Sequence, residues 1–481
     1  MSAAPTLSGS AATSGPAWIA ASTPDDRDRV IDAVRVTSLL VVVLGHWLMA
    51  DVSVVDGGVR ASNVLDQFPA LHIVTWLFQV MPLFFVAGGF ANATVWRRIC
   101  GASRWTGNET AGERHDHRRE VRGCYVAYVR ARMSRLLTPV LVFALLAQGT
   151  LGIARLAGLP ETMVGEIAQA WGQPLWFLAI YIVVTALAPV MVQLHARAPA
   201  GVLAGLAGAV ATADLTRMTT DAGGIAYTNF LLVWLFAQQL GFWYADGRLA
   251  RVPRRTSWAI VVAVAACLAA LTSLGPYPVS MVGVAGEMSN MNPPSFCLAL
   301  LAAGQTALVM LIRPRLERWL QRPRVWGGVV SAGAMAMTVY LWHLVALVAV
   351  LGAAYVLEVG LPEGGTMGWW MTRPLWLAIL LVVLVLLAVP VSRLERLHTS
   401  RRERGRGGDG PAPAAVAVLS GLVLATAGLA GYATSGLEPF GSTDGWLLGL
   451  DRGSLPSSVC LLVGWLLSCH RGSHDRRSHH I

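Results

Sequence analysis

Apolar runs long enough to cross a membrane recur along this chain, and they constrain its fold more than any other feature. A bilayer core of about 30 Å requires about 20 helical residues at 1.5 Å each. The runs lie at 34–50, 72–95, 136–156, 174–194, 200–214, 227–245, 257–275, 295–312, 327–356, 374–392, 412–432 and 455–469. Only 13% of the 481 residues are charged, whereas soluble domains contain about a quarter. We therefore predict an all-α polytopic membrane protein, in which the short runs 200–214 and 455–469 are the weakest membrane helices.

The arginines predict how these helices are oriented. The segment 96–135 carries ten Arg against four acidic residues, and the connections after the sixth, eighth and tenth runs are also basic. The connections between them, such as 51–58, hold little or no Arg. By the positive-inside rule, this alternation places the N-terminus in the cytoplasm and predicts a multi-pass protein of the plasma membrane. Its basic surface is expected to meet anionic lipid headgroups and not nucleic acid.

Composition also divides the chain into four parts. We expect a flexible cytoplasmic tail at 1–29, a core of ten transmembrane helices at 30–395, a basic cytoplasmic linker at 396–413 and a C-terminal extension at 414–481. The extension holds one or two further membrane helices and a basic tail. The N-terminus lacks the charged and apolar regions of a signal peptide.

Several common site types have no support. The six cysteines form no CxxC pair, so neither a disulfide framework nor a zinc site is expected. The histidine-rich C-terminus favours a solvated tail over a metal site. The sequence contains no GxSxG, Walker or HExxH pattern, which argues against serine hydrolases, P-loop proteins and zincins.

Arg35 and His46 carry the clearest chemical signal. They are eleven residues apart in the first run, so they lie on one helix face, about 20° apart and roughly 16 Å along the axis. One interpretation is a neutral histidine that bonds a neighbouring helix. The other is a functional site, because an ionisable group inside a membrane is costly and a neutral histidine can accept a proton at neutral pH.

Other motifs are weaker when each is taken alone. The second run contains Pro82, Gly88 and Gly89 in the segment MPLFFVAGGF, which suits either a packing kink or a broken helix beside a cavity. Arg132 and Arg135 stand three apart before the third run. They suit either topology or a phosphate clamp.

Aromatic and histidine side chains recur in two later runs. Trp176 and Tyr181 lie in the segment LWFLAIY, where an interfacial aromatic belt is the simpler interpretation. Tyr340 and His343 lie in the segment YLWH of the ninth run, and His343 is a second histidine inside the membrane.

The order of these motifs resembles the acyltransferase 3 family of membrane-bound acyltransferases over residues 27–395. The spacing from Arg35 to His46 and the pair Arg132 and Arg135 are its most specific parts. The resemblance implies a bundle of about ten transmembrane helices that transfers an acyl group, often acetyl, from cytoplasmic acyl-CoA. The acceptor implied is a hydroxyl of a cell-envelope carbohydrate or another exported molecule, and no permanently bound cofactor is implied.

The resemblance also implies roles for single residues. His46 would be the catalytic histidine and Arg35 its companion. Arg130, Arg132 and Arg135 would serve the acyl-CoA donor. The substrate pocket would include Phe85, Gly89, Trp176, Tyr181, Tyr340 and His343.

Three departures from the family pattern stand out. Gly88 replaces the usual serine and Tyr181 stands where glutamate is frequent, so a hydroxyl and a carboxylate are missing. No soluble esterase-like domain follows the core, so the chain looks like a stand-alone membrane acyltransferase. Direct attack by the acceptor and an acyl-histidine intermediate both stay open. A proton-coupled secondary transporter is the alternative function, and a non-catalytic scaffold is a third.

Overall fold

The structure is a computed structural model of the whole chain. It describes residues 20, 22–24, 27–55, 58–101, 111–220, 223–284, 288–404, 415–439 and 454–469. The elements in chain order are α2 (Arg29–Met49), β1 (Ala50–Val55), β2 (Gly58–Asn63), α3 (Val64–Gln67), η1 (Pro69–Val74), α4 (Thr75–Phe78), α5 (Met81–Cys100), α6 (Ala111–Leu156), α7 (Glu161–Gly172), α8 (Leu175–Arg197), α9 (Pro199–Thr219), η2 (Gly223–Thr228), α10 (Asn229–Ala245), η3 (Leu249–Arg251), α11 (Arg254–Ser273), α12 (Phe296–Leu320), α13 (Pro323–Val356), α14 (Met367–Arg404), α15 (Ala415–Ser435) and α16 (Leu455–Cys469).

Eleven helical segments of the described chain are long and apolar enough to cross a membrane. This confirms the prediction of an all-α polytopic membrane protein, and each predicted apolar run lies mostly on helix where the structure describes it. α9 has 21 residues, so the run at 200–214 is longer than predicted. α16 has only 15 residues, about 22 Å at 1.5 Å per residue, which is less than the bilayer core.

Asp28 is the N-cap residue of α2. Asp28 Oδ1 accepts a hydrogen bond from the Ile31 N–H at 3.0 Å, which satisfies one of the free amide donors of the first turn. The helix then runs through apolar residues to Met49, where the chain becomes extended at Ala50 and enters β1.

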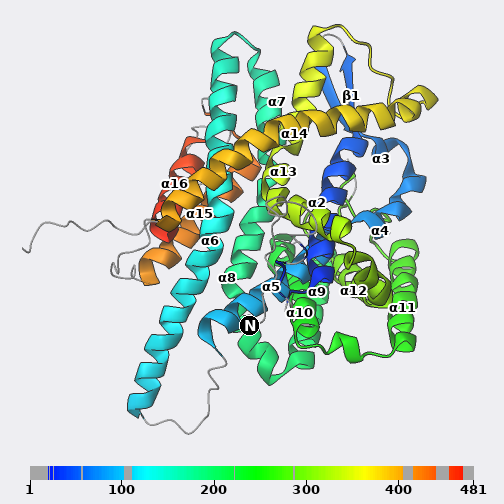
Figure 1. Ribbon diagram of the computed structural model, residues 1–481. Coiled ribbons are helices and arrows are strands. Elements are labelled where there is room, and N and C mark those ends of the chain that lie inside the picture. Colours follow the sequence, from blue (N-terminus) through cyan, green and yellow to red (C-terminus); the bar gives the residue numbers. More distant parts are fainter. Residues whose placement is uncertain are drawn as a thin grey trace, which may run out of the picture.

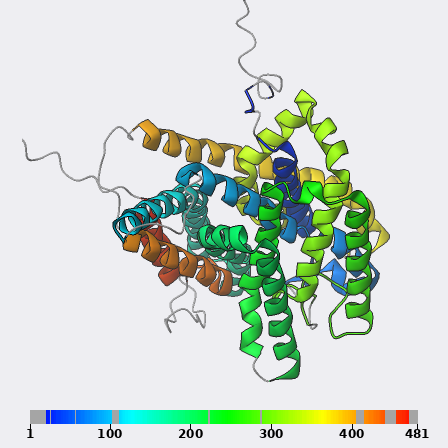
Figure 2. The ribbon, with the colours of Figure 1, turned by 90° about the horizontal axis from the view of Figure 1, so that it is seen from below.

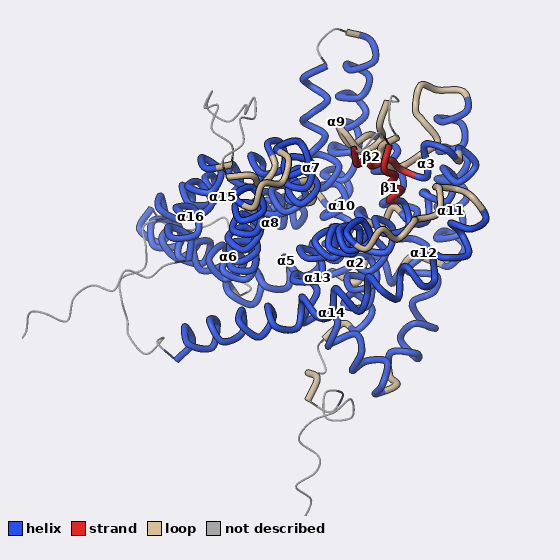
Figure 3. Tube along the Cα trace, turned by 90° about the horizontal axis from the view of Figure 1, so that it is seen from above, coloured by secondary structure: helices blue, strands red, loops and turns tan. Residues whose placement is uncertain are grey.

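A short β-hairpin follows α2, and the sequence did not predict it. β1 pairs with β2 in antiparallel register from Ala50 opposite Asn63 to Val55 opposite Gly58. We call this end of the bundle the hairpin end. Figure 3 shows the two strands beside α3 at one side of the bundle.

The opposite end, where α2 begins, is the arginine-rich end. Residues at the ends of α2, α10 and α12 meet there around one cavity, and Arg27, Arg29 and Arg313 are among them. α11 lies at one edge of the molecule, and α15 and α16 lie at the other edge beside α6 (Figure 1 and Figure 2).

Two segments that were predicted to be connections are helical in the structure. α14 continues to Arg404, so the first part of the predicted linker 396–413 is helical. Arg, Glu and Leu favour helix, and no Gly or Pro interrupts them between Pro390 and Gly405. α7 forms a further helix within a segment that was predicted to be a connection.

The C-terminal helices α15 and α16 pack against each other and against the core. A β-carbon on Gly464 would lie 2.5 Å from the Ala425 nitrogen, so the two backbones touch where both residues are small. Gln148 of α6 donates hydrogen bonds to Ser454 and Ser458 at 2.7 and 2.9 Å. The extension is therefore docked on α6.

α5 and α10 approach equally closely inside the core. A β-carbon on Gly89 would overlap the carbonyl oxygen of Gln238, and one on Gly241 would overlap that of Val86. These glycines allow two helix backbones to touch, which places the rest of α5 against α2 and α8.

Candidate active site

The two membrane histidines, His46 and His343, form a direct pair. α2 and α13 run side by side, and they bring His46 Nδ1 to 2.8 Å from His343 Nε2. The two rings stack at 5.0 Å with 25° between their planes. His343 is fully buried. The sequence identified both histidines but not their contact.

A backbone carbonyl assigns the protons in this pair. His343 Nδ1 lies 2.5 Å from the Tyr340 carbonyl oxygen, which can only accept, so Nδ1 carries a proton. With both rings neutral, His343 Nε2 then offers a lone pair and His46 Nδ1 donates to it. The proton of His46 therefore sits on Nδ1, and its Nε2 keeps a free lone pair.

Tryptophans hold the pair in place. The Trp47 indole N–H donates to the His343 carbonyl oxygen at 3.0 Å, and the Trp376 indole N–H donates to the Trp47 carbonyl oxygen at 3.3 Å. Trp47 is 1% exposed. α2, α13 and α14 are thus joined directly around His46. Trp47 is not among the site residues predicted from the sequence, although it directly follows His46.

Arg35 lies apart from the histidine pair. Its guanidinium forms an ion pair with Asp32 at 3.2 Å, one turn nearer the arginine-rich end. It also faces Gly333 of α13, where a β-carbon would lie 3.8 Å from Arg35 Nη2. With eleven residues and about 16 Å of helix between them, Arg35 does not contact His46.

A small apolar cavity of about 10 Å³ begins one helical turn from the histidine pair, at Val42 and Tyr340, and neither histidine lines it. α2 contributes Ser38, Leu39 and Val42, and the other walls come from Met81, Phe84, Phe177 and Tyr340. The α2 residues lie between Arg35 and His46 on nearly the same face, so helical spacing could have identified Leu39 and Val42. The aromatic walls come from three distant segments.

Arg132 belongs to an internal polar network. Its Nη2 donates to Asn92 Oδ1 at 2.6 Å, and Asn92 Nδ2 donates to Gln238 Oε1 at 2.9 Å. Arg132 Nε is buried and has no hydrogen-bond partner within the described chain. Arg135 is exposed and Arg130 is partly exposed. The role of these arginines in donor binding stays a prediction. In the structure, Arg132 is hydrogen-bonded to Asn92.

Of the six predicted pocket residues, Tyr340 alone lines the small cavity. Gly89 sits in the backbone contact between α5 and α10, where a side chain has no room. Phe85 stacks on Trp234 at 4.5 Å and is 1% exposed. Trp176 packs against Phe230 at 5.8 Å. Phe85 and Trp176 nevertheless pack 5.5 and 6.2 Å from Phe177, which lines the small cavity, so they lie directly behind its wall.

Gly88 and Tyr181, the two departures from the family pattern, are neighbours in space. A β-carbon on Gly88 would lie 3.0 Å from Tyr181 Cε2 and 3.3 Å from its hydroxyl oxygen. The Tyr181 ring packs 5.6 Å from Phe84 and 5.9 Å from Phe177, two walls of the small cavity. The absence of a side chain at Gly88 therefore makes room for the tyrosine.

A larger cavity of about 820 Å³ lies at the arginine-rich end. Arg27, Arg29 and Arg313 line it together with Asp28 and Glu317. Its volume is in the range of small-molecule sites. The cavity lies roughly 24 Å along α2 from His46, because sixteen residues separate Val30 from the histidine.

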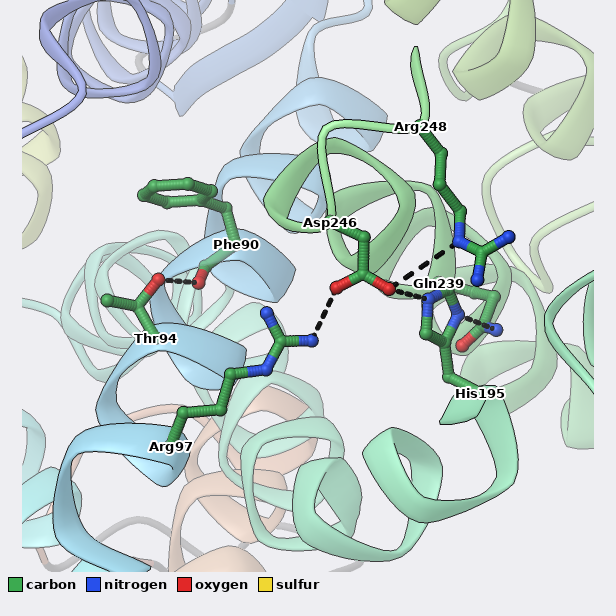
Figure 4. A network of polar contacts seen from close by, with 7 residues as sticks. All are labelled: Phe90, Thr94, Arg97, His195, Gln239, Asp246 and Arg248. Atoms are coloured by element: carbon green, nitrogen blue, oxygen red, sulfur yellow. Dashed lines mark hydrogen bonds and ion pairs between the residues drawn. The ribbon is translucent and has the colours of Figure 1, made fainter. Parts of the chain in front are cut away.

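A polar clamp joins the ends of α5, α8 and α10 near this cavity (Figure 4). Asp246 accepts hydrogen bonds from Arg97 at 2.6 Å and from His195 at 3.0 Å. Gln239 Nε2 donates to His195 Nδ1 at 2.7 Å, which leaves the proton of His195 on Nε2, facing the carboxylate. Burial alone would raise the pKa of Asp246, but the hydrogen bonds and charges of Arg97 and His195 outweigh it and hold the pKa below its usual range.

Comparison with known proteins gives one result. Residues 28–393 match the family model for the acyltransferase domain, a region that runs from the cap of α2 into α14. It contains the histidine pair, Arg132 and the lining of both cavities except Arg27, whereas α15 and α16 lie outside it. Searches of curated proteins and of solved structures found no match.

Proposed function

The chain belongs to the acyltransferase 3 family and is a membrane acyltransferase, and on this premise we propose that it transfers a short acyl group from acyl-CoA to a hydroxyl through His46. The donor is acyl-CoA, with acetyl-CoA as the first choice. The acceptor is a hydroxyl of a carbohydrate or another molecule of the cell envelope.

The single observation that supports this proposal is the hydrogen-bonded series from the Tyr340 carbonyl through His343 to His46. It leaves a lone pair on His46 Nε2, which is the requirement for a general base. A histidine whose distal nitrogen is held by a fixed partner is also a common arrangement in acyl transfer.

The proposed reaction uses that lone pair twice. His46 Nε2 takes the proton of the acceptor hydroxyl while the hydroxyl oxygen attacks the thioester carbonyl carbon. The bond between that carbon and sulfur then breaks, and His46 returns the proton to the thiolate, so that the products are an ester and free CoA. In the other route, His46 Nε2 attacks the thioester carbon and CoA leaves as the thiolate. The acceptor hydroxyl then displaces His46 from the acyl group, and the hydroxyl proton goes to the thiolate.

We propose that the donor approaches from the arginine-rich end, which would face the cytoplasm. The partly exposed side chain of Arg35 and the exposed side chain of Arg135 are suited to its phosphates, because a guanidinium group can donate two hydrogen bonds to phosphate oxygens. The thioester would then reach His46 on the extended arm of the coenzyme. The acceptor would approach from the hairpin end.

The test is a titration of purified protein with acetyl-CoA, followed by thermal unfolding. A ligand that binds only the folded state stabilises it by about 2.7 kcal/mol at ~100 times its Kd. A saturable shift in the wild type and in His46→Ala is expected, together with loss of acyl transfer to native membranes in His46→Ala by about 10²–10⁴-fold or more. Folded protein that gives a flat titration with acetyl-, propionyl- and longer acyl-CoA would contradict the donor.

A further inference from the structure

The small apolar cavity beside the histidine pair has a location that suits the transferred group. Val42, in its wall, lies one helical turn from His46 on the same face of α2. Tyr340, in the opposite wall, has its ring 5.8 Å from the His343 ring. A group attached to a carbonyl carbon at His46 would therefore have this cavity as its neighbour.

The walls of the cavity are mostly apolar, which favours an apolar occupant. Five of the seven lining side chains are hydrocarbon or thioether, and the other two are Ser38 and Tyr340. The Tyr340 hydroxyl already donates to the Pro174 carbonyl oxygen at 2.8 Å. The cavity of about 10 Å³ has room for about one water-sized group, and apolar cavities favour alkyl groups over water.

The aromatic walls support one another. Phe84 and Phe177 meet edge to face at 5.1 Å, and Phe177 meets Tyr340 in the same manner at 5.6 Å. Tyr181 packs behind the first two rings, against Gly88. Moving any one ring would therefore displace its neighbours, which makes expansion of the cavity costly.

From this arrangement we propose that the cavity receives the alkyl part of the acyl group, and that Phe84 and Phe177 are the residues that determine its length. This inference rests on the proposed acyl-CoA donor. The methyl group of an acetyl thioester fits the space, whereas each further methylene requires the two rings to move. A rigid apolar pocket discriminates by about 10–200-fold for each methylene.

The experiment compares acetyl-, propionyl-, butyryl- and hexanoyl-CoA as donors in native membranes that contain the full-length protein. Release of free CoA thiol is measured, and membranes with His46→Ala supply the background. Wild type is expected to use acetyl-CoA at least tenfold better than butyryl-CoA. Phe177→Ala and Phe84→Ala are expected to raise the ratio of butyryl to acetyl turnover at least tenfold.

Two further variants keep the test decisive. Val42→Ala enlarges the same cavity with a smaller loss of packing, and it is expected to shift the ratio in the same direction if the phenylalanine variants do not fold. Phe242→Ala removes a fully buried ring outside the cavity, and it should leave the ratio unchanged. Equal use of hexanoyl and acetyl donors by wild type, or unchanged ratios in active cavity variants, would overturn the assignment. Thiol release at the His46→Ala level with every donor would instead reject the donor itself, and the inference with it.

Discussion

His343 Nε2 is the partner that keeps the proton of His46 on Nδ1, so we expect substitutions at His343 to act through His46. Glutamine keeps an acceptor oxygen for the His46 N–H, whereas leucine fills similar space without one. His343→Leu should lower kcat by about 10–100-fold, because it removes the hydrogen-bond acceptor that orients His46. The KM for acetyl-CoA should change little. His343→Gln should retain more activity. Measured pH profiles and kcat values that rank the two variants equally would contradict this role.

The close contact between Gly88 and Tyr181 gives a second prediction about single residues. Gly88→Ser places a side chain 3.0 Å from the Tyr181 ring, which is confined by other aromatic rings. We expect it to cost about 1–3 kcal/mol of the free energy of unfolding. The loss should disappear in the Tyr181→Val background, where the ring is absent. Gly149→Ser, on an open face of α6, is the matched control. Additive losses in the double variant would show that the two residues are independent.

At the scale of elements, the clamp at Asp246 joins three helix ends through one carboxylate. Asp246→Asn removes the charge that Arg97 and His195 share, and we expect the free energy of unfolding to fall by about 1–2 kcal/mol at neutral pH. Arg248→Gln should matter little, because that arginine is 44% exposed and 3.6 Å from Asp246. Thermal unfolding of the three proteins measures both effects.

The lowered pKa of Asp246 gives the clamp a pH dependence with a definite sign. The folded-state pKa of Asp246 lies below the ordinary aspartate value of about 4. The contribution of the Asp246 carboxylate to the free energy of unfolding is therefore fully present above that value. It is lost as the pH falls further, through the lowered pKa. The stability difference between wild type and Asp246→Asn should therefore be constant from about pH 5 to 7 and shrink below about pH 4. A difference that grows on acidification would contradict the ion pair.

At the scale of the whole molecule, α15 and α16 lie outside the family domain that contains the histidine pair. They dock on α6 and α8 of this domain, whereas the histidine pair lies on α2 and α13. Gly464→Leu would place a side chain against Ala425 and should separate the two helices. We expect a lower Tm with acetyl-CoA binding retained. Gly352→Leu, on an exposed part of α13, is the control. Loss of binding without a change in Tm would show that the extension takes part in the site.

Much of this architecture could be predicted from the sequence. The number and approximate positions of the apolar helices follow from local composition, because a lipid bilayer requires about 20 apolar residues for each crossing. The common face of Arg35 and His46 follows from helical spacing within one segment. The β-hairpin and α7 were missed, since neither is long enough to leave an apolar run of that length.

Only the tertiary structure decided how remote helices meet. His46 and His343 are 297 residues apart in the chain, and their hydrogen bond depends on the packing of α2 against α13. Arg132 reaches Asn92 across a contact between α5 and α6, and this hydrogen bond could not be predicted from the sequence. The width of the cavity beside His46 depends on four helices at once. Such contacts are set by the shapes of many side chains together, and no single segment of sequence encodes them.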